Sequence, residues 1–369
     1  MSDSSIVRSL GGGLPSPLRG PARVLWRGGR RRLARLLGRG REEGAAAALK
    51  REERAIEAGQ AAYAAALRAE RGASFLMRRN VHRIEKGLIT TPRRRVFATD
   101  FIGETVGEYE AVVRGRGGRG AGPELAWARD VLTRYFAETD PEDPTIAAAR
   151  RRFEGVPRPG DALAAPVDLR AAPGPAHPFR RQDGAPPVAI EALSALAARR
   201  RSVRSYRPEP VPREVVERAV AVAAQSPSAC NRQAFSMLFF DDPETARRVG
   251  RVPAGTKTFV DGMTGIAVIV GHLRAYPRAR DRHAIYVDGG LAAMALILAL
   301  EAQGVGTCAI NWSDEEPAES RIKGMLGLRD DDRVVMMMSY GWPDPDAEVP
   351  FSAKRPVAEL AEWNRELRA

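Results

Sequence analysis

The chain has 369 residues, enough for one large domain or two of ordinary size; 44% of them are hydrophobic and 28% are charged. This composition excludes a membrane-embedded bundle and a wholly disordered chain. The formal net charge is +12, yet residues 1–41 alone hold ten Arg, no Lys and a single acid, so they contribute +9 and leave +3 for the other 328 residues. The charge therefore belongs to the N-terminus and says little about a substrate.

Residues 1–45 are rich in Arg, Gly and Pro, and two interpretations compete for them. Residues 23–39 mix arginines with bulky apolar residues, as a basic helix on anionic lipid would. The apolar contacts of such a helix would be Leu25, Trp26, Leu33, Leu36 and Leu37. Gly28 and Gly29 lie inside it and favour a solvated, flexible tail. We expect the tail, with weak contact of residues 23–39 with a membrane surface as the alternative.

Helix-forming residues dominate the next part of the chain, and residues 46–136 are expected to form a helical region. Helices are predicted over residues 42–71, 75–88 and 100–113, with a further helical piece over 125–136. His82 and Glu85 are three apart and share a helix face, so they could form an acid/base or ligand pair. No further ligand lies near them in the sequence, which favours a structural pair.

Residues 137–187 are rich in Pro, Ala and Asp, and are predicted to be a linker that buries no core. A domain is expected over residues 188–369, where predicted strands alternate with helices. The strands are predicted over residues 236–240, 265–271, 306–311 and 333–340. The long helix over 288–303 is apolar around its whole circumference, which predicts burial on all sides; it is too short for a membrane span.

Four separate motifs of this domain carry candidate chemistry. Arg200–Tyr206 packs three arginines and a hydroxyl at a helix end, a set able to bind phosphate or carboxylate. Ser226–Gln233 offers Ser228, Asn231 and Gln233, whose polar groups can read the edge of a heterocycle. Gly304–Cys308 permits close backbone approach to a flat ligand, although a helix C-cap alone explains Gly304. Lys354 to Pro356 is either a phosphate clamp or a plain basic surface.

In this order and at these separations, the four motifs resemble those of the nitroreductase family of FMN-dependent oxidoreductases, over roughly residues 190–365. The resemblance implies an α+β fold: a three-layer sandwich with a central mixed sheet flanked by helices, here preceded by the helical N-terminal region. It also implies a homodimer with FMN at the subunit interface.

The resemblance further implies roles for single residues. Arg200, Ser202 and Arg355 would hold the FMN phosphate, with Arg201 and Lys354 as helpers. Arg204 would face the pyrimidine edge of the flavin, where its charge supports the reduced anion. Three residues of the partner chain would contact the isoalloxazine ring: Pro227, Ser228 and Asn231. The backbone of Gly306 and Thr307 would lie near flavin N5. Ala229 departs from the family pattern, which has a second Ser there.

Two cysteines, Cys230 and Cys308, stand 78 positions apart, so a disulfide is not expected and a reducing compartment fits better. Both are predicted to be packing residues, because FMN would supply the redox chemistry. With no Cys or His cluster, no metal site is expected. Gly and Pro interrupt the first residues, which argues against a signal peptide and favours a cytoplasmic protein.

The predicted function is transfer of hydride from NADH or NADPH, through flavin N5, to an electron-poor small molecule by a ping-pong mechanism, with no catalytic side chain required. One alternative is a specialised flavin-dependent biosynthetic oxidase or dehydrogenase. Another is a membrane- or partner-binding protein that uses the fold as a scaffold. Nucleic-acid binding is not expected, because the arginines lack interleaved aromatics beyond Trp26. Residues 256–261 and 273–283 are the loops expected to shape the substrate pocket.

Overall fold

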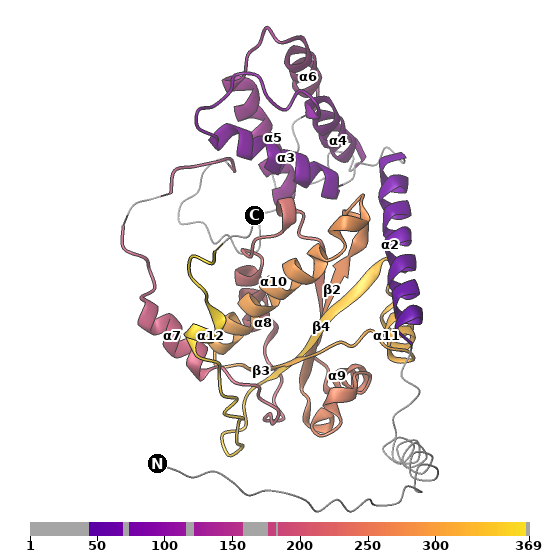
Figure 1. Cartoon of the computed structure of the whole chain (residues 1–369), viewed down its shortest axis with the longest axis vertical. Helices are drawn as coiled ribbons and strands as arrows, with labels where there is room; N and C mark the ends of the chain where they lie inside the picture. The colour runs from indigo at the N-terminus through magenta and orange to yellow at the C-terminus, as the bar shows by residue number, and fades with distance from the viewer. Residues whose placement is uncertain (1–43, 69–73, 116–121, 158–175, 182–183, 367–369) are drawn as a thin grey trace, which may run out of the picture. The chain divides into compact units, whose positions relative to one another are not determined.

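A computed structural model describes residues 44–68, 74–115, 122–157, 176–181 and 184–366 (Figure 1). The basic tail and the alternative membrane-contacting helix over residues 23–39 lie outside these described residues. The helices before residue 188 are α2 (Ala45–Arg68), α3 (Ser74–Ile89), α4 (Ile102–Gly115), α5 (Pro123–Glu138) and α6 (Pro144–Glu154). Most of the described residues between 46 and 136 are helical, with a non-helical stretch over residues 90–101 between α3 and α4.

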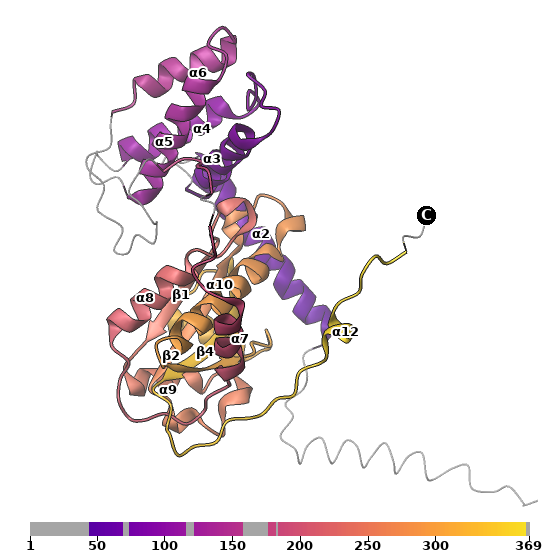
Figure 2. The same cartoon turned by 90° about the vertical axis from the view of Figure 1, so that its left-hand side faces the viewer.

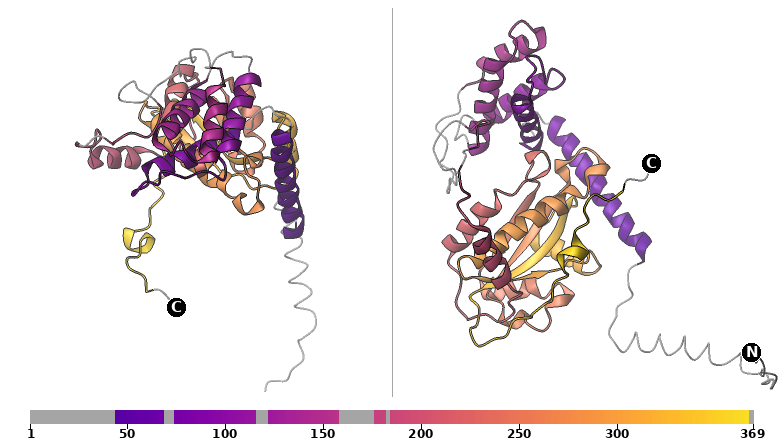
Figure 3. Two further views of the ribbon diagram at one scale, coloured as in Figure 1. Left: turned by 90° about the horizontal axis from the view of Figure 1, so that it is seen from above. Right: turned by 60° about the vertical axis from the view of Figure 1, so that its left-hand side comes forward.

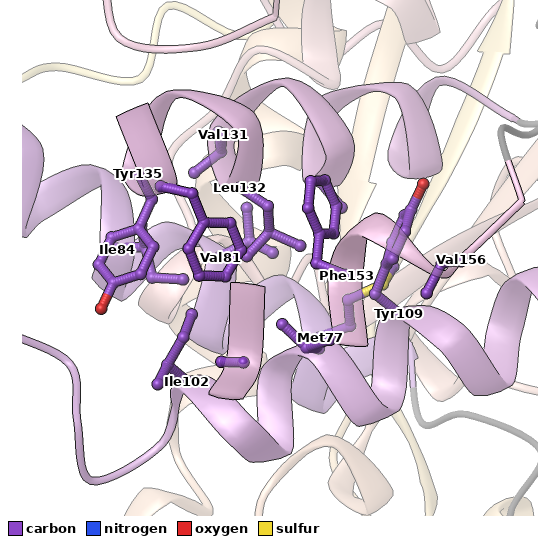
Figure 4. Packing of buried hydrophobic residues seen from close by; sticks show 14 of the residues in the cluster. Met77, Val81, Ile84, Ile102, Tyr109, Val131, Leu132, Tyr135, Phe153 and Val156 are labelled. Carbon is purple, nitrogen blue, oxygen red and sulfur yellow. The ribbon is translucent and has the colours of Figure 1, made fainter. Parts of the chain in front are cut away.

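Helices α3 to α6 share one hydrophobic core and gather in one group (Figure 2). Each helix contributes an apolar stripe with helical spacing, such as Met77, Val81, Ile84 and Leu88 of α3. Aromatic rings fill the centre: the Tyr109 and Phe153 centroids lie 5.8 Å apart, and both rings are visible in Figure 4. A core of this kind can hold the four helices together by itself.

The predicted linker over residues 137–187 is corrected at its first part, because α6 lies inside it and joins this core. Asp143 caps the helix, its carboxylate accepting the backbone N–H of Thr145 and Ile146 at 3.0 Å each, and Pro144 follows at the first turn. Phe153 is buried. The overall Pro and Ala content hid this local start signal and the apolar spacing behind it. Most of the remaining stretch, residues 158–175, lies outside the described residues.

The C-terminal part is an α+β domain built on one four-stranded sheet of order β1-β2-β4-β3 (Figure 1). Its strands are β1 (Phe235–Phe240), β2 (Gly265–His272), β3 (Gly306–Ile310) and β4 (Asp332–Gly341). All three strand pairs are antiparallel, and a parallel bridge joins Ser202 to Thr307 beside β3. The predicted α+β fold, with a central sheet flanked by helices, is confirmed, but the described strands pair antiparallel throughout, so the predicted mixed sheet is corrected in its strand directions.

Two apolar clusters cover the two faces of the sheet. The first joins α8 (Arg213–Ala223) and α10 (Ala284–Glu301) to side chains such as Ile269 and Met338. The second joins α9 (Pro243–Gly250) and α11 (Ala318–Leu326) to the opposite face, through side chains such as Val268 and Met337. Because adjacent strand residues point to opposite faces, every second residue of β2 serves each cluster.

Helix α10 crosses the sheet and is apolar enough, by length and composition, for residues 279–301 to pass as a membrane span (Figure 1). Leu296 and Leu300 are nevertheless buried against the sheet cluster, as in the core helix of a globular domain. The prediction of burial on all sides is wrong for the single chain. Val287, Leu291 and Met294 are 59%, 45% and 43% exposed, and their spacing of four and three puts them on one face. Helix α10 therefore has a buried face and a bare apolar face.

Two further segments bury little in the single chain. Every residue of α7 (Ile190–Arg199) is at least partly exposed. After β4 the chain makes a turn at residues 345–347 and then runs as a tail with the single helical turn α12 (Val357–Leu360), and residues 351–360 are exposed throughout (Figure 3). Ile190 and Phe351 are among the apolar side chains left uncovered in these segments.

Replacing Phe153 by Ala tests whether α6 belongs to the helical core. We expect a loss of about 3–4 kcal/mol in the free energy of unfolding, because a buried ring is removed and a cavity remains. Urea denaturation of the full chain measures this loss. The control is Arg150→Ala on the same helix, whose exposed pair with Glu154 should cost less than about 1 kcal/mol. Equal stability of the two variants would contradict the assignment of α6 to the core.

Candidate functional site

The structure brings the arginine block Arg200–Arg204 alongside the residues that follow α10. Ser202 bridges Thr307 in parallel, and the Val203 backbone N–H donates to the Thr307 carbonyl at 2.9 Å. A side chain at Gly306 would meet Val203 Cγ2 at 2.7 Å, so only glycine allows this approach. Two motifs that are about a hundred residues apart in the sequence therefore lie together at one end of the site.

Helix α10 reaches this end because it stops sharply. Gly304 has a φ of 81°, a left-handed conformation that ends the helix, and Val305 N–H donates back to the Leu300 carbonyl at 3.0 Å. Arg199 fixes the same end from the other side: its guanidinium lies 2.9 Å from the Glu301 carboxylate. This geometry confirms that Gly304 ends the helix. The glycine that permits close backbone packing is Gly306, which lies against Val203.

The arginines of the block differ in what they contact. Arg201 donates to the Arg200 carbonyl at 2.8 Å, and the exposed Arg204 guanidinium lies over the Phe259 ring at 5.7 Å from its centroid. Among the residues that the structure describes, the buried Nε of Arg200 has no hydrogen-bond partner. A buried donor without an acceptor costs free energy, so Arg200 is ready to bind an anion.

Cys308 lies beside the block and is held as a thiol. Burial raises its pKa, while nearby Arg204 and Ser202 oppose that shift without reversing it. A thiol with a raised pKa is a poor nucleophile and a poor redox partner at neutral pH. Cys230 and Cys308 are both free, in agreement with the prediction that no disulfide joins them.

The second predicted set, Pro227, Ser228 and Asn231, lies on a loop that contains the short helix η1 (Ala229–Asn231). Cys230, Asn231 and Gln233 have φ values of 53°, 51° and 51°, a left-handed conformation that costs a non-glycine residue about 1–2 kcal/mol. Such a conformation persists only where neighbouring groups fix it. The loop is therefore strained and held from outside.

Asp288, in the first half of α10, is the main anchor of this loop. Its two carboxylate oxygens accept the Ala229 N–H at 3.1 and 3.0 Å, and the Tyr276 hydroxyl donates to it at 3.1 Å. Burial raises the pKa of Asp288, while the bonds from Ala229 and Tyr276 and the charge of Arg232 act against that shift. The sequence placed Asp288 at the start of the central helix but gave its carboxylate no role.

The polar side chains of the loop partly satisfy one another. Ser228 Oγ accepts the Gln233 N–H at 3.0 Å, and Gln233 Nε2 donates to Asn231 Oδ1 at 3.0 Å. The side chain of Gln233, considered as a reader of a heterocycle edge, thus supports Asn231. Within the part of the chain that the structure describes, the Ser228 hydroxyl hydrogen and the Asn231 amide N–H₂ are available as donors toward a ligand.

One chain does not unite the two sets of predicted residues. The loop is anchored by Asp288 and the arginine block by Glu301, near the two ends of α10. Asp288 and Glu301 are 13 residues apart on that helix, which corresponds to about 20 Å along its axis. Lys354 and Arg355 lie on the exposed C-terminal segment, where Arg355 Nε pairs with Glu359 at 3.0 Å. Arg200, Arg201, Ser202, Arg204, Gly306 and Thr307 therefore form one group, and the loop forms another.

His82 and Glu85 contact each other at 3.5 Å on α3, and Glu85 also accepts the Trp127 Nε1–H at 3.0 Å. This geometry agrees with the structural interpretation of the pair, because the carboxylate ties α3 to α5.

Residues 197–342 match the family model described as the nitroreductase family. These residues form a nitroreductase-family domain. Iodotyrosine deiodinase of Nematostella vectensis is 24% identical over 44% of this chain and 71% of its own length. A protein described as the NAD(P)H nitroreductase YdgI, from Bacillus subtilis, is 25% identical over 44% of this chain and 93% of its own length.

An NADH dehydrogenase of Thermus thermophilus is 25% identical over 45% of this chain and 93% of its length. Among solved structures, a protein described as the nitroreductase ydfN of Bacillus subtilis is 20% identical, with a TM-score of 0.42 over 47% of this chain and all of that one. The family match and these relatives support an oxidoreductase. They match less than half of this chain, and the family model ends before Lys354.

A separate polar cluster stabilises the domain at the edge of its sheet. His272 Nδ1 lies 2.7 Å from Asp332 and Nε2 lies 3.0 Å from the Ser236 hydroxyl, while the Arg274 guanidinium bridges Asp331 and Asp332. Burial by itself would raise the pKa of Asp332, but the hydrogen bonds from His272 and Arg274 outweigh it and hold that pKa well below its usual range. Because Arg274 also lies 3.1 Å from His272 Nδ1, the imidazole is held in place from both ring nitrogens.

The Asp332 carboxylate should make stability depend on acid pH. Since its folded pKa is depressed, its contribution is complete above the unfolded pKa, near 4, and is lost as the pH falls below that value. We expect Asp332→Asn to lower the free energy of unfolding by about 3 kcal/mol at pH 7, because the half-buried Arg274 guanidinium loses one of its two carboxylate partners. Urea denaturation between pH 7 and 3 should show a smaller difference in the free energy of unfolding between the variant and wild type as the pH falls.

The control is Asp241→Asn, whose pair with Arg213 is exposed; it should lower the free energy of unfolding by less than about 1 kcal/mol. A difference for Asp332→Asn that stays constant with pH would refute this account.

Proposed function

We propose that the chain is an FMN-dependent oxidoreductase that transfers hydride from NADH or NADPH to an electron-poor small molecule. The observation that carries this proposal is the arginine block, packed against Gly306 and Thr307 inside a nitroreductase-family domain. A cytoplasmic location belongs to the same proposal and rests on the sequence alone.

The donor set suits the FMN phosphate. Arg200 offers a buried, unpartnered Nε, and Ser202 next to it offers a hydroxyl. A phosphate accepts several charge-assisted hydrogen bonds, and arginine supplies them in a fixed planar arrangement. Arg201 would assist, and Lys354 and Arg355 would approach from the exposed C-terminal segment. When bound, FMN would supply the chemistry itself, by accepting hydride at N5 and passing it to the acceptor.

The protein would contribute position and charge. Arg204, held over Phe259, would place a permanent cation where negative charge develops on reduction. Phe259 belongs to residues 256–261, one of the two loops expected to shape the substrate pocket, so charge and pocket wall lie together. The strained loop would present Pro227, Ser228 and Asn231 in a fixed geometry, which lowers the entropic cost of ordering the reactants. Cys308, kept as a thiol, would pack without taking part.

Two features of α10 support a homodimer. Its face formed by Val287, Leu291 and Met294 is apolar and exposed, which is unfavourable for an isolated chain. The loop and the arginine block lie near opposite ends of the same helix. Antiparallel packing of two α10 helices about a two-fold axis would cover the apolar face and bring the loop of one protomer toward the arginine block of its partner.

Absorption spectroscopy of the purified protein, before and after FMN is added, tests the cofactor. We expect bound oxidised FMN that is bleached anaerobically by NADH or NADPH. Arg200→Met should weaken FMN binding about 10- to 100-fold, since one charge-assisted contact with the phosphate is lost.

The matched control is Arg213→Met, whose exposed guanidinium pairs with Asp241 and should not contribute to FMN binding. A colourless protein that also refuses added FMN would refute the proposal and leave the scaffold alternative. Bound FMN that a metabolite reduces, while both nicotinamides fail, would favour the biosynthetic oxidase alternative. Nitro compounds and iodinated phenols form the panel of acceptors for the second half-reaction, as the names of two relatives suggest.

Leu291→Arg tests the dimer. A charge on the exposed face of α10 should split the dimer into monomers, because it cannot be paired across a two-fold apolar contact. Light scattering after gel filtration measures the mass, and the monomer should bind FMN at least about tenfold more weakly. Leu49→Arg, on an exposed position of α2, should leave both properties unchanged. A Leu291→Arg protein that is still dimeric would exclude this face as the interface.

A further inference from the structure

The loop that would face the flavin is contacted by a residue from outside the nitroreductase-family domain. Arg78 of α3 donates its Nε–H to the backbone carbonyl of Asn231 at 2.9 Å, across 153 positions of sequence. Asn231 is one of the left-handed residues of the loop, and its side-chain Oδ1 accepts a hydrogen bond from Gln233. The helical region therefore contacts the loop at a strained peptide.

Three restraints together define the loop backbone. Asp288 holds the Ala229 N–H from α10, and Ser228 Oγ holds the Gln233 N–H from within the loop. Arg78 holds the Asn231 carbonyl from the third side. The first two fix the start and the end of the loop, and Arg78 fixes the middle, where the backbone is left-handed.

Arg78 is itself held in place within the helical region. Its guanidinium lies 3.6 Å from the Glu124 carboxylate and 5.4 Å from the centroid of the Trp127 ring, both on α5. Trp127 in turn donates to Glu85 of α3 at 3.0 Å. A planar guanidinium held by a carboxylate and an aromatic ring has little rotational freedom. The Arg78 Nε–H is therefore kept directed at the Asn231 carbonyl.

Apolar packing supports the same junction. Phe75 of α3 and Ile56 of α2 pack against a cluster of Ala234, Tyr276 and Ile285, and Ala229 packs against that cluster too. Tyr276 also donates to Asp288. It therefore takes part both in the contacts that hold the loop and in the apolar cluster that α3 packs against.

We propose that Arg78 is a positioning residue for the loop Ser226–Gln233, so that the helical region completes the flavin site. That the site binds a flavin rests on the proposed function. The restraint of the loop backbone by Arg78 does not depend on it. Arg78 would act through the peptide of Asn231, turning its side-chain amide and the neighbouring Ser228 toward the ring. A protein with the helical region displaced would then keep the domain fold and lose the geometry of the site.

Amide hydrogen exchange of the full-length, flavin-free protein tests the restraint. In Arg78→Met we expect the amides of residues 229–233 to exchange about tenfold faster than in wild type, because one restraint on a strained backbone is lost. Peptides from β2 should keep their wild-type rates. Faster exchange spread evenly through the domain, or wild-type exchange in the loop, would overturn the proposal.

The flavin arm of the test uses binding and visible circular dichroism of added FMN. Arg78→Met should weaken FMN binding about tenfold and change the visible dichroism, which reports the surroundings of the bound ring. The matched control is Arg83→Met on the same helix: its guanidinium stacks on Phe101 at 3.6 Å and contacts Asp100, so it should alter neither readout. Unchanged binding and dichroism in Arg78→Met would overturn the proposal.

Arg78→Lys keeps the charge beside Glu124 but lacks the directed Nε donor, so it should show the same changes in a folded protein; wild-type values in both readouts would overturn the proposal. If Arg78→Met does not fold, the same measurements on Arg78→Lys decide the question. If wild type binds no FMN, the proposed function fails while the exchange comparison still decides whether Arg78 holds the loop.

Discussion

Helix α10 buries one apolar face against strands β2 and β4, and this packing fixes the position of nearly everything that could act as a site. Leu296 and Leu300 lie against Ile269 and Met338 in a single cluster with α8. Because the helix is rigid and its ends are anchored at Asp288 and Glu301, it sets the separation between the loop and the arginine block. The same helix leaves its opposite face apolar and bare, so the element that organises one chain also offers the surface for a second.

The helical region before the domain has a core of its own and contacts the domain at a point where position matters. Aromatic packing around Tyr109 and Phe153 makes α3 to α6 a self-supporting group of helices. Through Arg78 this group reaches the Asn231 carbonyl, and through Phe75 it joins the apolar cluster beside Tyr276. A rigid support is what a loop with several left-handed residues requires, because such a backbone relaxes when its partners are removed.

The buried charged residues described next stabilise the fold of the domain rather than contribute to the candidate site. Arg333 pairs with Glu319 at 3.0 Å and with Asp314 at 2.9 Å, and Trp312 donates to the same Glu319. The Asp332 cluster plays the corresponding role at the edge of the sheet. Both networks compensate buried charges internally, which specifies one arrangement of strands and helices. The Nε atoms of Arg200 and of Arg333 are both buried without a hydrogen-bond partner among the described residues, but the other guanidinium nitrogens of Arg333 pair with Glu319 and Asp314.

Much of the local structure could be read from the sequence. Alternating and helical periodicity predicted all four strands and the helices between them, because those signals depend only on neighbouring residues. The motifs from Arg200 to Thr307 indicated the family for the same reason. Where the local signal was diluted, as at Asp143 and Pro144 in a Pro-rich stretch, the prediction missed α6 and called the segment a linker.

Only the tertiary structure determined which of these elements contact one another. It brought Ser202 beside Thr307, gave Asp288 the Ala229 amide and Arg78 the Asn231 carbonyl, and left one face of α10 uncovered. Contacts across tens to hundreds of residues depend on how helices pack on the sheet, and no local pattern encodes that packing. The sequence by itself determined the elements and the motif residues; the fold determined which of them meet within one chain, and which remain apart until a partner joins them.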